Sequence, residues 1–327
     1  MIFLFLSHFD LNLFRFRLPI MCRLVEKGHH VFAVCPSGQV SGKFQEFGIF
    51  HKHWDLIRDN KNPFHEIKII NQLAQIYDEI NPDLVHAFTI RPNLYGSYAS
   101  MRPRFSFKIV NSVTGMGTLY NQRNRVKEKC ISYFVNITYK WAFSKSNIVI
   151  FQNHDDLNYF IHRKIVPPEK AKLIRGSGVN TDLFQPQEGK NNLKSVLFQI
   201  RKEVVILFVA RLIREKGVLE FCQAARILKE KYKDQVHFVV IGDIDRGNPS
   251  CLSWDDLEEF RNTGIVQFTG HLDEPQPYYA ACDIFCLPSF YREGLPVTVL
   301  EAMASGLPVV TTDAPGCRET IDEGVSG

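Results

Sequence analysis

The stretch "VVILFVARLIREKGVLEFCQAARILKEKY" (residues 204–232) decides the fold class. Its first six residues are all apolar and include three valines and an isoleucine, which is typical of a strand buried on both faces. Apolar residues then recur at helical spacing over 217–232, which predicts an amphipathic helix. A second apolar run, "VHFVVIG" (236–242), follows after three residues. Strand, helix and strand in this order form the unit of a parallel sheet, so the stretch predicts an α/β protein.

The same alternation runs through both halves of the chain. The segment 176–194 between the halves contains Gly, Pro and polar residues without periodicity, which indicates a linker. We therefore expect a pair of Rossmann-like, doubly wound domains facing a cleft, 1–178 and 179–327, with ligands outside the carboxyl ends of the strands. The expected strands are 2–7, 30–36, 84–89 and 107–114 in the first half, and 204–210, 236–242, 265–270, 283–289 and 308–312 in the second. The expected helices include 14–28, which would end at Gly28, 217–232 and one that begins near 297.

The overall composition is that of a soluble globular protein, with 45% hydrophobic and 23% charged residues among 327. No window reaches the ~18 uninterrupted apolar residues that a transmembrane helix needs. The opening "MIFLFLSH" predicts a buried strand because no basic residue precedes it and no small-residue cleavage site follows. The eight cysteines form no CxxC pair, which favours a reducing cytoplasm and argues against a metal site.

Charge is divided unequally between the halves. Residues 1–178 hold 24 Lys and Arg against 13 Asp and Glu, whereas residues 179–327 hold 15 against 22. A basic half suggests an anionic partner or a membrane surface. Nucleic acid is the other interpretation, but no recognised nucleic-acid-binding module is present. No GxGxxG follows a first strand, which disfavours a dinucleotide dehydrogenase.

Two basic residues follow the strand at 204–210. Arg211 can donate two hydrogen bonds to phosphate oxygens, and Lys216 can add a point charge just before a glycine and a helix. This arrangement favours a diphosphate-binding loop. The alternative is a solvated turn that carries surface charges.

Two carboxylates flank a turn and a helix in "REGLPVTVLEAMASGLPVV" (292–310). The amides of Leu295, Val297 and Thr298 lie where an anion can bind a helix N-terminus. Glu293 and Glu301 could accept hydrogen bonds from sugar hydroxyls. In the alternative interpretation, the first is a capping acid and the second an exposed helix residue.

Taken together, these motifs resemble the donor domain of the family 4 glycosyltransferases of the GT-B fold. The resemblance covers essentially the whole chain, and "IRGSGVNTDLFQP" (174–186) looks like that family's crossing into the second domain. The resemblance implies that Arg211 and Lys216 neutralise the leaving diphosphate of a nucleotide-sugar. It further implies the following contacts: Glu301 with the ribose, Glu293 with the transferred sugar, the amides after Gly294 with the distal phosphate, and Gly270, His271 and Leu272 around the base. His271 could instead be an ordinary surface histidine.

The family transfers sugars with retention of configuration, generally without a metal. The resemblance thus implies a UDP-sugar substrate, no cofactor, and catalysis that depends mainly on electrostatic stabilisation of the departing diphosphate by Arg211 and Lys216. Glu293, in contact with the transferred sugar, is the third residue that it implies is catalytic.

A narrower resemblance concerns the acceptor. "VTGMG" and "NPSC" (248–251) look most like bacterial enzymes that add N-acetylgalactosamine to diacetylbacillosamine on undecaprenyl diphosphate. This implies a lipid-linked saccharide acceptor and peripheral contact with the inner face of the membrane. The segment 121–145 interleaves basic and aromatic residues and could lie at such a surface, although it could equally be a helix that packs on the core.

Further acceptor-side candidates are scattered over the first half. Arg15 and Arg17 could contact the acceptor diphosphate. Thr114, followed by Gly115, stands where many relatives have a histidine that touches the donor sugar. His86 keeps a family-like position, or it is a buried structural histidine.

Relatives in this family continue beyond the "DEGVSG" that ends this sequence, so the resemblance implies an incomplete second domain. Three hypotheses follow: an active membrane-associated transferase, a truncated chain that at most binds a nucleotide-sugar, and a nucleotide-sugar epimerase of the same fold. The third is disfavoured because the segment from Glu293 to Glu301 matches the transferases better.

Overall fold

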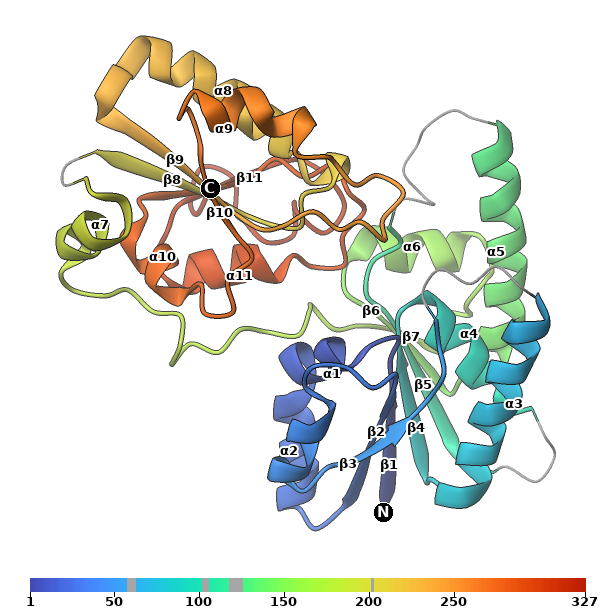
Figure 1. The fold of residues 1–327 in the computed structure, drawn as a ribbon. Coiled ribbons are helices and arrows are strands. Elements are labelled where there is room, and N and C mark those ends of the chain that lie inside the picture. Colours follow the sequence, from blue (N-terminus) through green and yellow to red (C-terminus); the bar gives the residue numbers. More distant parts are fainter. Residues whose placement is uncertain (58–62, 102–105, 118–125, 201–202) are drawn as a thin grey trace. The chain divides into compact units, whose positions relative to one another are not determined.

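The computed structural model describes residues 1–57, 63–101, 106–117, 126–200 and 203–327 (Figure 1). The chain forms two compact units, Met1–Ser177 and Gly178–Gly327. Each is built on one parallel sheet. None of the helices in the described ranges combines the length and apolar character that crossing a membrane would require.

The first unit contains a seven-stranded parallel sheet in the order β3-β2-β1-β4-β5-β6-β7. The order reverses direction at β1, which lies between β2 and β4, as expected of a doubly wound fold. Its strands are β1 (Ile2–Leu6), β2 (His30–Cys35), β3 (Phe50–His53), β4 (Leu84–Phe88), β5 (Lys108–Val113), β6 (Ile148–Phe151) and β7 (Ala171–Leu173).

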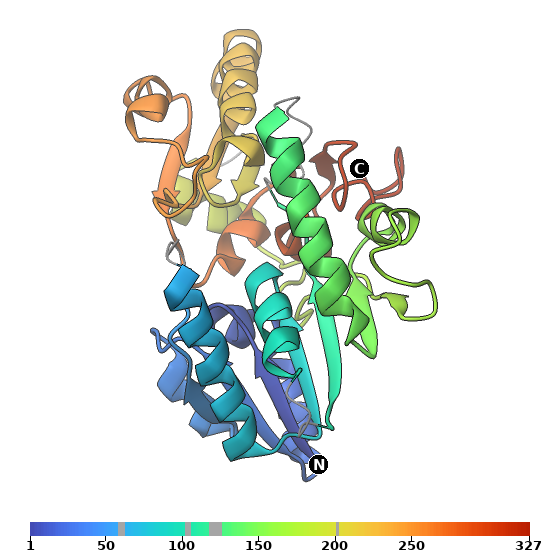
Figure 2. The same ribbon diagram turned by 90° about the vertical axis from the view of Figure 1, so that its right-hand side faces the viewer.

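Helices cover the two faces of this sheet unequally. Figures 1 and 2 show α3, α4 and α5 side by side on one face, with α1 and α2 on the other. Phe160 of α6 packs against Tyr139 and Phe143 of α5. The helices of this unit are α1 (Asp10–Phe16), α2 (Leu18–Glu26), α3 (Pro63–Ile80), α4 (Ile90–Ala99), α5 (Val126–Ser144) and α6 (His154–His162), with a 3-10 helix at Ser41–Phe47.

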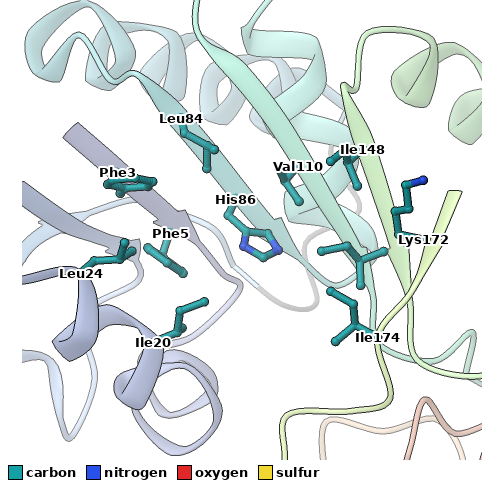
Figure 3. Close-up of a pocket in the computed structure, with 11 residues that line it drawn as sticks. Phe3, Phe5, Ile20, Leu24, Leu84, His86, Val110, Ile148, Lys172 and Ile174 are labelled. Carbon is teal, nitrogen blue, oxygen red and sulfur yellow. The ribbon is translucent and has the colours of Figure 1, made fainter. Parts of the chain in front are cut away.

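An apolar pocket of about 310 Å³ opens on the sheet face that α2 only partly covers (Figure 3). Ile20 and Leu24 of α2 form one side, and residues of β1, β4, β5, β6 and β7 form the floor. Its aliphatic and aromatic lining includes Phe3, Phe5, Leu84, Val110, Ile148 and Ile174, and His86 and Lys172 are its polar members.

The second unit contains a five-stranded parallel sheet in the order β10-β9-β8-β11-β12. Its order also reverses at the first strand, because β8 pairs with both β9 and β11. The strands are β8 (Val204–Val209), β9 (Val236–Ile241), β10 (Gln267–Gly270), β11 (Ile284–Leu287) and β12 (Val309–Thr311), and the helices are α7 (Lys190–Phe198), α8 (Val218–Tyr232), α9 (Glu258–Asn262), α10 (Gln276–Ala281) and α11 (Val297–Ala304).

A buried lysine ties α7 to this sheet. Lys194 Nζ donates to Asp283 Oδ2 at 2.5 Å, and the same oxygen accepts a hydrogen bond from the Val205 amide at 2.8 Å. Lys190 Nζ lies 3.0 Å from the other carboxylate oxygen. These bonds neutralise Asp283 and hold its pKa below the ordinary value, although burial alone would raise it.

The two-sheet α/β prediction is confirmed, and every expected strand occurs, shorter by one to a few residues. The predicted single helix over 14–28 is wrong. It is two helices that break at Arg17, because Pro19 has no amide hydrogen to continue the first and is accepted in the first turn of the second. The linker prediction is wrong at its end, where α7 begins at Lys190.

Candidate functional site

The candidate donor residues lie in loops at the carboxyl edge of the second sheet. Because its strands are parallel, the loops after β8, β9, β10, β11 and β12 all emerge there. Backbone bonds join neighbouring loops: the Ala210 amide donates to Ile241 O at 3.1 Å, and the Gly242 amide donates to Gly270 O at 2.9 Å. Segments more than 100 residues apart thus share one surface of this unit.

Lys216 and Glu293 form an ion pair at the centre of this edge. Lys216 ends the 3-10 turn Arg214–Lys216, and its ammonium group contacts Glu293 Oε1. The two side chains are only 13% and 11% exposed. Ser289 Oγ also donates to Glu293 Oε1, at 3.2 Å. The carboxylate is therefore fixed by a cation and a hydroxyl rather than directed freely into solvent.

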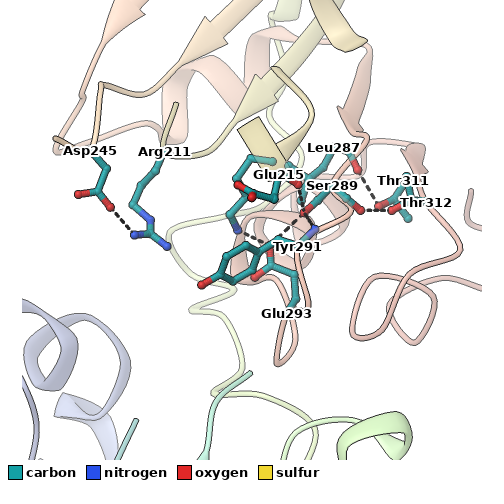
Figure 4. Close-up of polar contacts among 10 residues, drawn as sticks. Arg211, Glu215, Asp245, Leu287, Ser289, Tyr291, Glu293, Thr311 and Thr312 are labelled. Atoms are coloured by element: carbon teal, nitrogen blue, oxygen red, sulfur yellow. Dashed lines mark hydrogen bonds and ion pairs between the residues drawn. The ribbon is translucent and has the colours of Figure 1, made fainter. Parts of the chain in front are cut away.

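Arg211 forms a second ion pair, 2.5 Å from Nη1 to Asp245 Oδ2 (Figure 4). The Asp245 side chain is 12% exposed, whereas that of Arg211 is 49% exposed. The carboxylate therefore lies against the protein while the guanidinium reaches solvent. A guanidinium group has five N–H donors, so Arg211 can bind a further anion while it keeps this contact.

Tyr291 connects the two pairs. Its ring centroid lies 5.3 Å from Lys216 Nζ, and its hydroxyl end points toward the Arg211 side of the site in Figure 4. Burial and the neighbouring Glu293 raise the pKa of this phenol, and Arg211 opposes the shift. Tyr291 therefore stays protonated at neutral pH and can donate a hydrogen bond to an anion.

Glu215 supports the loop that carries Tyr291 and Glu293. Its carbonyl oxygen accepts hydrogen bonds from the amides of Phe290 at 2.9 Å and Tyr291 at 3.0 Å. Its buried carboxylate accepts from Ser250 Oγ at 2.7 Å. One residue thereby links the loops after β8, β9 and β11.

Glu301 lies one turn into α11, where Tyr279 Oη donates to its Oε2 at 2.8 Å. Tyr279 is fully buried, and burial together with Glu301 raises the pKa of its phenol well above the ordinary value. The backbone hydrogen bonds of α11 begin with Val299, whose amide donates to Pro296 O at 3.1 Å. The predicted donors of Leu295, Val297 and Thr298, together with Gly294, therefore lie at or just before the first turn of this helix.

Gly270 and His271 lie at the far end of the same edge, where β10 ends. Gly270 has a φ of 76°, in the region that favours glycine, and His271 is exposed beside Asp273 at 3.4 Å. The structure thus gathers all predicted donor-side residues on one edge of one sheet. Their individual roles stay predictions.

The first-unit candidates have different environments from one another. Arg17 is buried: its Nη1 donates to Ser177 Oγ at 2.6 Å, its guanidinium carbon lies 4.4 Å from the Phe88 ring centroid, and burial lowers its pKa to about 10. Arg15 is exposed on α1. Thr114 and Gly115 follow β5, and Gly115 has a φ of 108°.

His86 lies within the apolar pocket of the first unit (Figure 3). Its Nε2 is 2.8 Å from Ser112 Oγ, and its ring centroid is 4.1 Å from that of Phe88. Burial, with a smaller contribution from Arg17, lowers the pKa of this imidazole to about 3. It is therefore neutral at physiological pH, which favours the structural interpretation over a role in binding an anion.

Sequence analysis missed four residues of the donor edge: Glu215, Asp245, Tyr279 and Tyr291. Asp245 and Tyr291 follow the ends of predicted strands, and this position could have suggested them. The contacts of Glu215 and Tyr279 join distant segments and leave no local signal. Together the edge offers two cations for an anion and acceptor oxygens for hydroxyl groups. No group of three potential ligands among the described residues could hold a metal ion.

Two family models match this chain. The model described as "Glycosyl transferase 4-like" matches residues 3–153, and "Glycosyl transferases group 1" matches residues 203–327. The chain is 31% identical to the N,N'-diacetylbacillosaminyl-diphospho-undecaprenol alpha-1,3-N-acetylgalactosaminyltransferase of Campylobacter jejuni, over 99% of this chain and 83% of that protein. It is 26% identical to the UDP-Gal:alpha-D-GlcNAc-diphosphoundecaprenol alpha-1,3-galactosyltransferase of Escherichia coli, over 77% of this chain and 63% of that protein.

Solved structures agree with this assignment of the fold. HepE of Anabaena, crystallised with UDP and glucose, superposes with a TM-score of 0.74 at 20% identity, over 100% of this chain and 84% of that one. WaaG, a glycosyltransferase involved in lipopolysaccharide biosynthesis, superposes with a TM-score of 0.70 at 18% identity, over 97% and 82% of the two chains. The family matches, the full-length relative and the two doubly wound sheets together establish that this chain belongs to the family 4 glycosyltransferases and has their GT-B fold.

Proposed function

We propose that this protein transfers an N-acetylhexosamine, N-acetylgalactosamine in the first instance, from a UDP-sugar to a saccharide carried on a polyprenyl diphosphate. The observation that carries the proposal is the identity of 31% over 99% of the chain to the Campylobacter enzyme that performs this type of transfer. The printed activity of the Escherichia coli relative, which also acts on a diphosphoundecaprenol-linked sugar, supports the same acceptor class.

The donor edge of the second unit has the chemistry that this substrate needs. Arg211 and Lys216 are the cations that would receive the diphosphate, and the neutral phenol of Tyr291 adds a hydrogen-bond donor beside them. Because negative charge grows on the leaving oxygen as the glycosidic bond breaks, cations fixed at that position stabilise the transition state more than the bound donor. Glu293 and Glu301 would accept hydrogen bonds from the hydroxyls of the transferred sugar and the ribose.

We further propose that transfer retains the anomeric configuration and needs no metal ion. Retention is the outcome that the family resemblance implies. The two cations at the donor edge can supply the positive charge that a divalent ion supplies in other enzymes. NMR of the product gives the anomeric configuration, and unchanged transfer in excess EDTA is the result expected for a metal-independent reaction.

We propose in addition that the first unit contacts the inner face of the membrane through α5. One face of this helix packs on the core through Tyr139, Ala142 and Phe143. Its other face carries an exposed apolar and aromatic stripe: Tyr133 at 63%, Phe134 at 68%, Ile137 at 48% and Trp141 at 49% exposure. Arg123 and Arg125, which the sequence prediction also used, lie outside the described residues.

Charge supports a lipid surface as the partner of this stripe. Lys140 and Lys145 are exposed beside it, and residues 1–178 carry a net charge of +11 in the sequence. Aromatic side chains and lysines together are typical of segments that lie at the headgroup level of anionic membranes.

The decisive experiment is transfer from radiolabelled UDP-N-acetylgalactosamine to undecaprenyl-diphosphate-linked diacetylbacillosamine, with UDP-N-acetylglucosamine and UDP-galactose in parallel. Label in the lipid phase from the first donor supports the proposal. Transfer from only one of the other two donors would mean that the proposed donor sugar is wrong and that the proposed type of reaction is correct. If a folded chain binds UDP but labels no lipid-linked acceptor, the proposed acceptor or the proposed activity is wrong.

Membrane contact is tested separately by co-sedimentation with vesicles. Wild type should bind vesicles that contain phosphatidylglycerol more tightly than pure phosphatidylcholine. Phe134→Ser should weaken this binding, because a large exposed apolar side chain contributes roughly 1–2 kcal/mol when it enters the interface. The matched control Val196→Ser removes an apolar side chain that is 78% exposed in the second unit and should change nothing. Equal losses in both variants would contradict a role for α5.

A further inference from the structure

The contact between Arg211 and Asp245 differs from a typical surface ion pair, because the Asp245 side chain is only 12% exposed and backbone hydrogen bonds fix its loop. Asp245 lies in the loop after β9, and the segment Asp243–Leu252 runs alongside residues 210–214. The Leu212 amide donates to Asp243 O at 2.9 Å, and the Leu252 amide donates to Leu212 O at 3.2 Å. The Asp245 carbonyl itself accepts from the Asn248 amide at 2.8 Å. The loop that carries Asp245 is therefore fixed beside the segment that carries Arg211.

Close packing of the two loops strengthens this conclusion. Gly242 has a φ of 150°, and a Cβ atom at this position would lie 1.9 Å from Ala210 O. Only glycine fits there. Any larger residue would push the loop that carries Asp245 away from the segment that carries Arg211.

Both cations of the proposed diphosphate site form ion pairs with carboxylates. Asp245 compensates Arg211, and Glu293 compensates Lys216. A diphosphate group that approaches Arg211 therefore meets a guanidinium whose charge is already partly neutralised, beside a carboxylate that repels it. The diphosphate can use the N–H donors of Arg211 that Asp245 does not occupy, but it competes with this carboxylate for the positive charge of the guanidinium.

We propose that Asp245 is a built-in counter-ion of Arg211 and competes with the donor diphosphate for its positive charge. This rests on the proposed UDP-sugar donor. Asp245 acts through Arg211 and is a positioning residue. It fixes the position of the guanidinium at the carboxyl edge of the second sheet, and it limits the affinity for diphosphate so that the UDP product leaves. Removal of its charge should therefore tighten the binding of UDP, whereas loss of a merely structural residue would weaken it.

The test is calorimetric titration of the full chain with UDP and, separately, with inorganic diphosphate. Asp245→Asn keeps the size and the hydrogen-bond acceptor but removes the charge. We expect both ligands to bind about fivefold more tightly, which is the scale of a half-exposed ion pair. Glu259→Gln is the matched control, since Glu259 pairs with Arg226 at 2.9 Å on the exposed surface of the same unit. It should leave both affinities unchanged.

A double-mutant cycle tests whether the effect passes through Arg211. In an Arg211→Gln background, Asp245→Asn should tighten UDP binding less than it does in wild type, because only the direct repulsion between Asp245 and the diphosphate is then removed. Equal or weaker binding by the single variant Asp245→Asn, or an undiminished gain in the Arg211→Gln background, would overturn the inference. Wild type could bind diphosphate but not UDP, while Asp245→Asn still tightens the binding of diphosphate. In that case the proposed nucleotide-sugar donor is wrong and the proposed counter-ion role of Asp245 is supported. If wild type binds neither ligand, both the proposed donor and the proposed role of Asp245 are wrong.

Discussion

Breaking the pair between Lys216 and Glu293 should destabilise the second unit as well as abolish activity. Both side chains are nearly nine-tenths buried. Lys216→Met therefore removes the ammonium group that compensates the Glu293 carboxylate at a position where water can hardly replace it. Removal of one partner of a buried pair costs about 3–5 kcal/mol. The hydroxyl of Ser289 still donates to Glu293 in this variant, so we expect the lower part of that range. For a unit of about 150 residues this corresponds to a fall in melting temperature of roughly 6–12 °C.

The double variant Lys216→Met with Glu293→Met should recover most of this loss. Replacement of both charges by apolar groups of similar volume is often neutral, and Ser289 Oγ keeps a contact with Glu215 O at 3.3 Å. Transfer activity should stay at least about 100-fold below wild type in both singles and in the double, because the variants lack the cation proposed to bind the diphosphate, the carboxylate proposed to contact the sugar, or both. Recovered stability without recovered activity would separate the catalytic role of the pair from its structural one.

Differential scanning calorimetry of the four proteins measures the stability cycle, and the transfer assay measures activity. Arg226→Met is the control, because it breaks an exposed pair with Glu259 and should change stability by less than about 0.5 kcal/mol. Melting of Lys216→Met within a degree of wild type would refute the claim that this pair is buried and coupled. A double variant less stable than either single would do the same.

Two further predictions concern the backbone and pH. Gly242→Ala should destabilise the second unit by about 2 kcal/mol or more and abolish UDP binding, because its Cβ would lie 1.9 Å from Ala210 O; urea titration should show a smaller loss for Gly264→Ala, which has no atom within 4 Å of its Cβ site. The pKa of His86 is lowered to about 3, so the unfolded chain binds this proton below pH 6.5 and the folded chain does not. Its contribution to stability should be lost as pH falls, by about 2 kcal/mol between pH 7 and pH 5. Urea unfolding of His86→Gln should lack this part of the acid destabilisation, and equal losses in both proteins would contradict the buried neutral imidazole.

Local sequence patterns determined the fold class and the donor motifs. The strands β8, β9, β11 and β12 and the helix α8 follow directly from apolar runs and helical spacing, since these signals lie within one element. The strands β3 (Phe50–His53), β6 (Ile148–Phe151) and β7 (Ala171–Leu173) were not predicted. Each has only three or four residues, which is too few to show a periodic pattern, and each is defined by its pairing with a neighbouring strand. The break at Arg17 escaped because apolar spacing continues across both helices.

Only the tertiary structure decided which contacts the charged residues of the site make. Arg211, Lys216 and Glu293 are visible in the sequence, but their partners stand 34 and 77 residues away along the chain. Parallel pairing brings the ends of β8, β9 and β11 to one edge, and this places Asp245 beside Arg211 and Glu293 beside Lys216. The sequence by itself predicted which residues could bind a diphosphate. The packing of the loops decided that each cation has a largely shielded carboxylate as its partner, because sequence spacing does not specify contacts between distant strands.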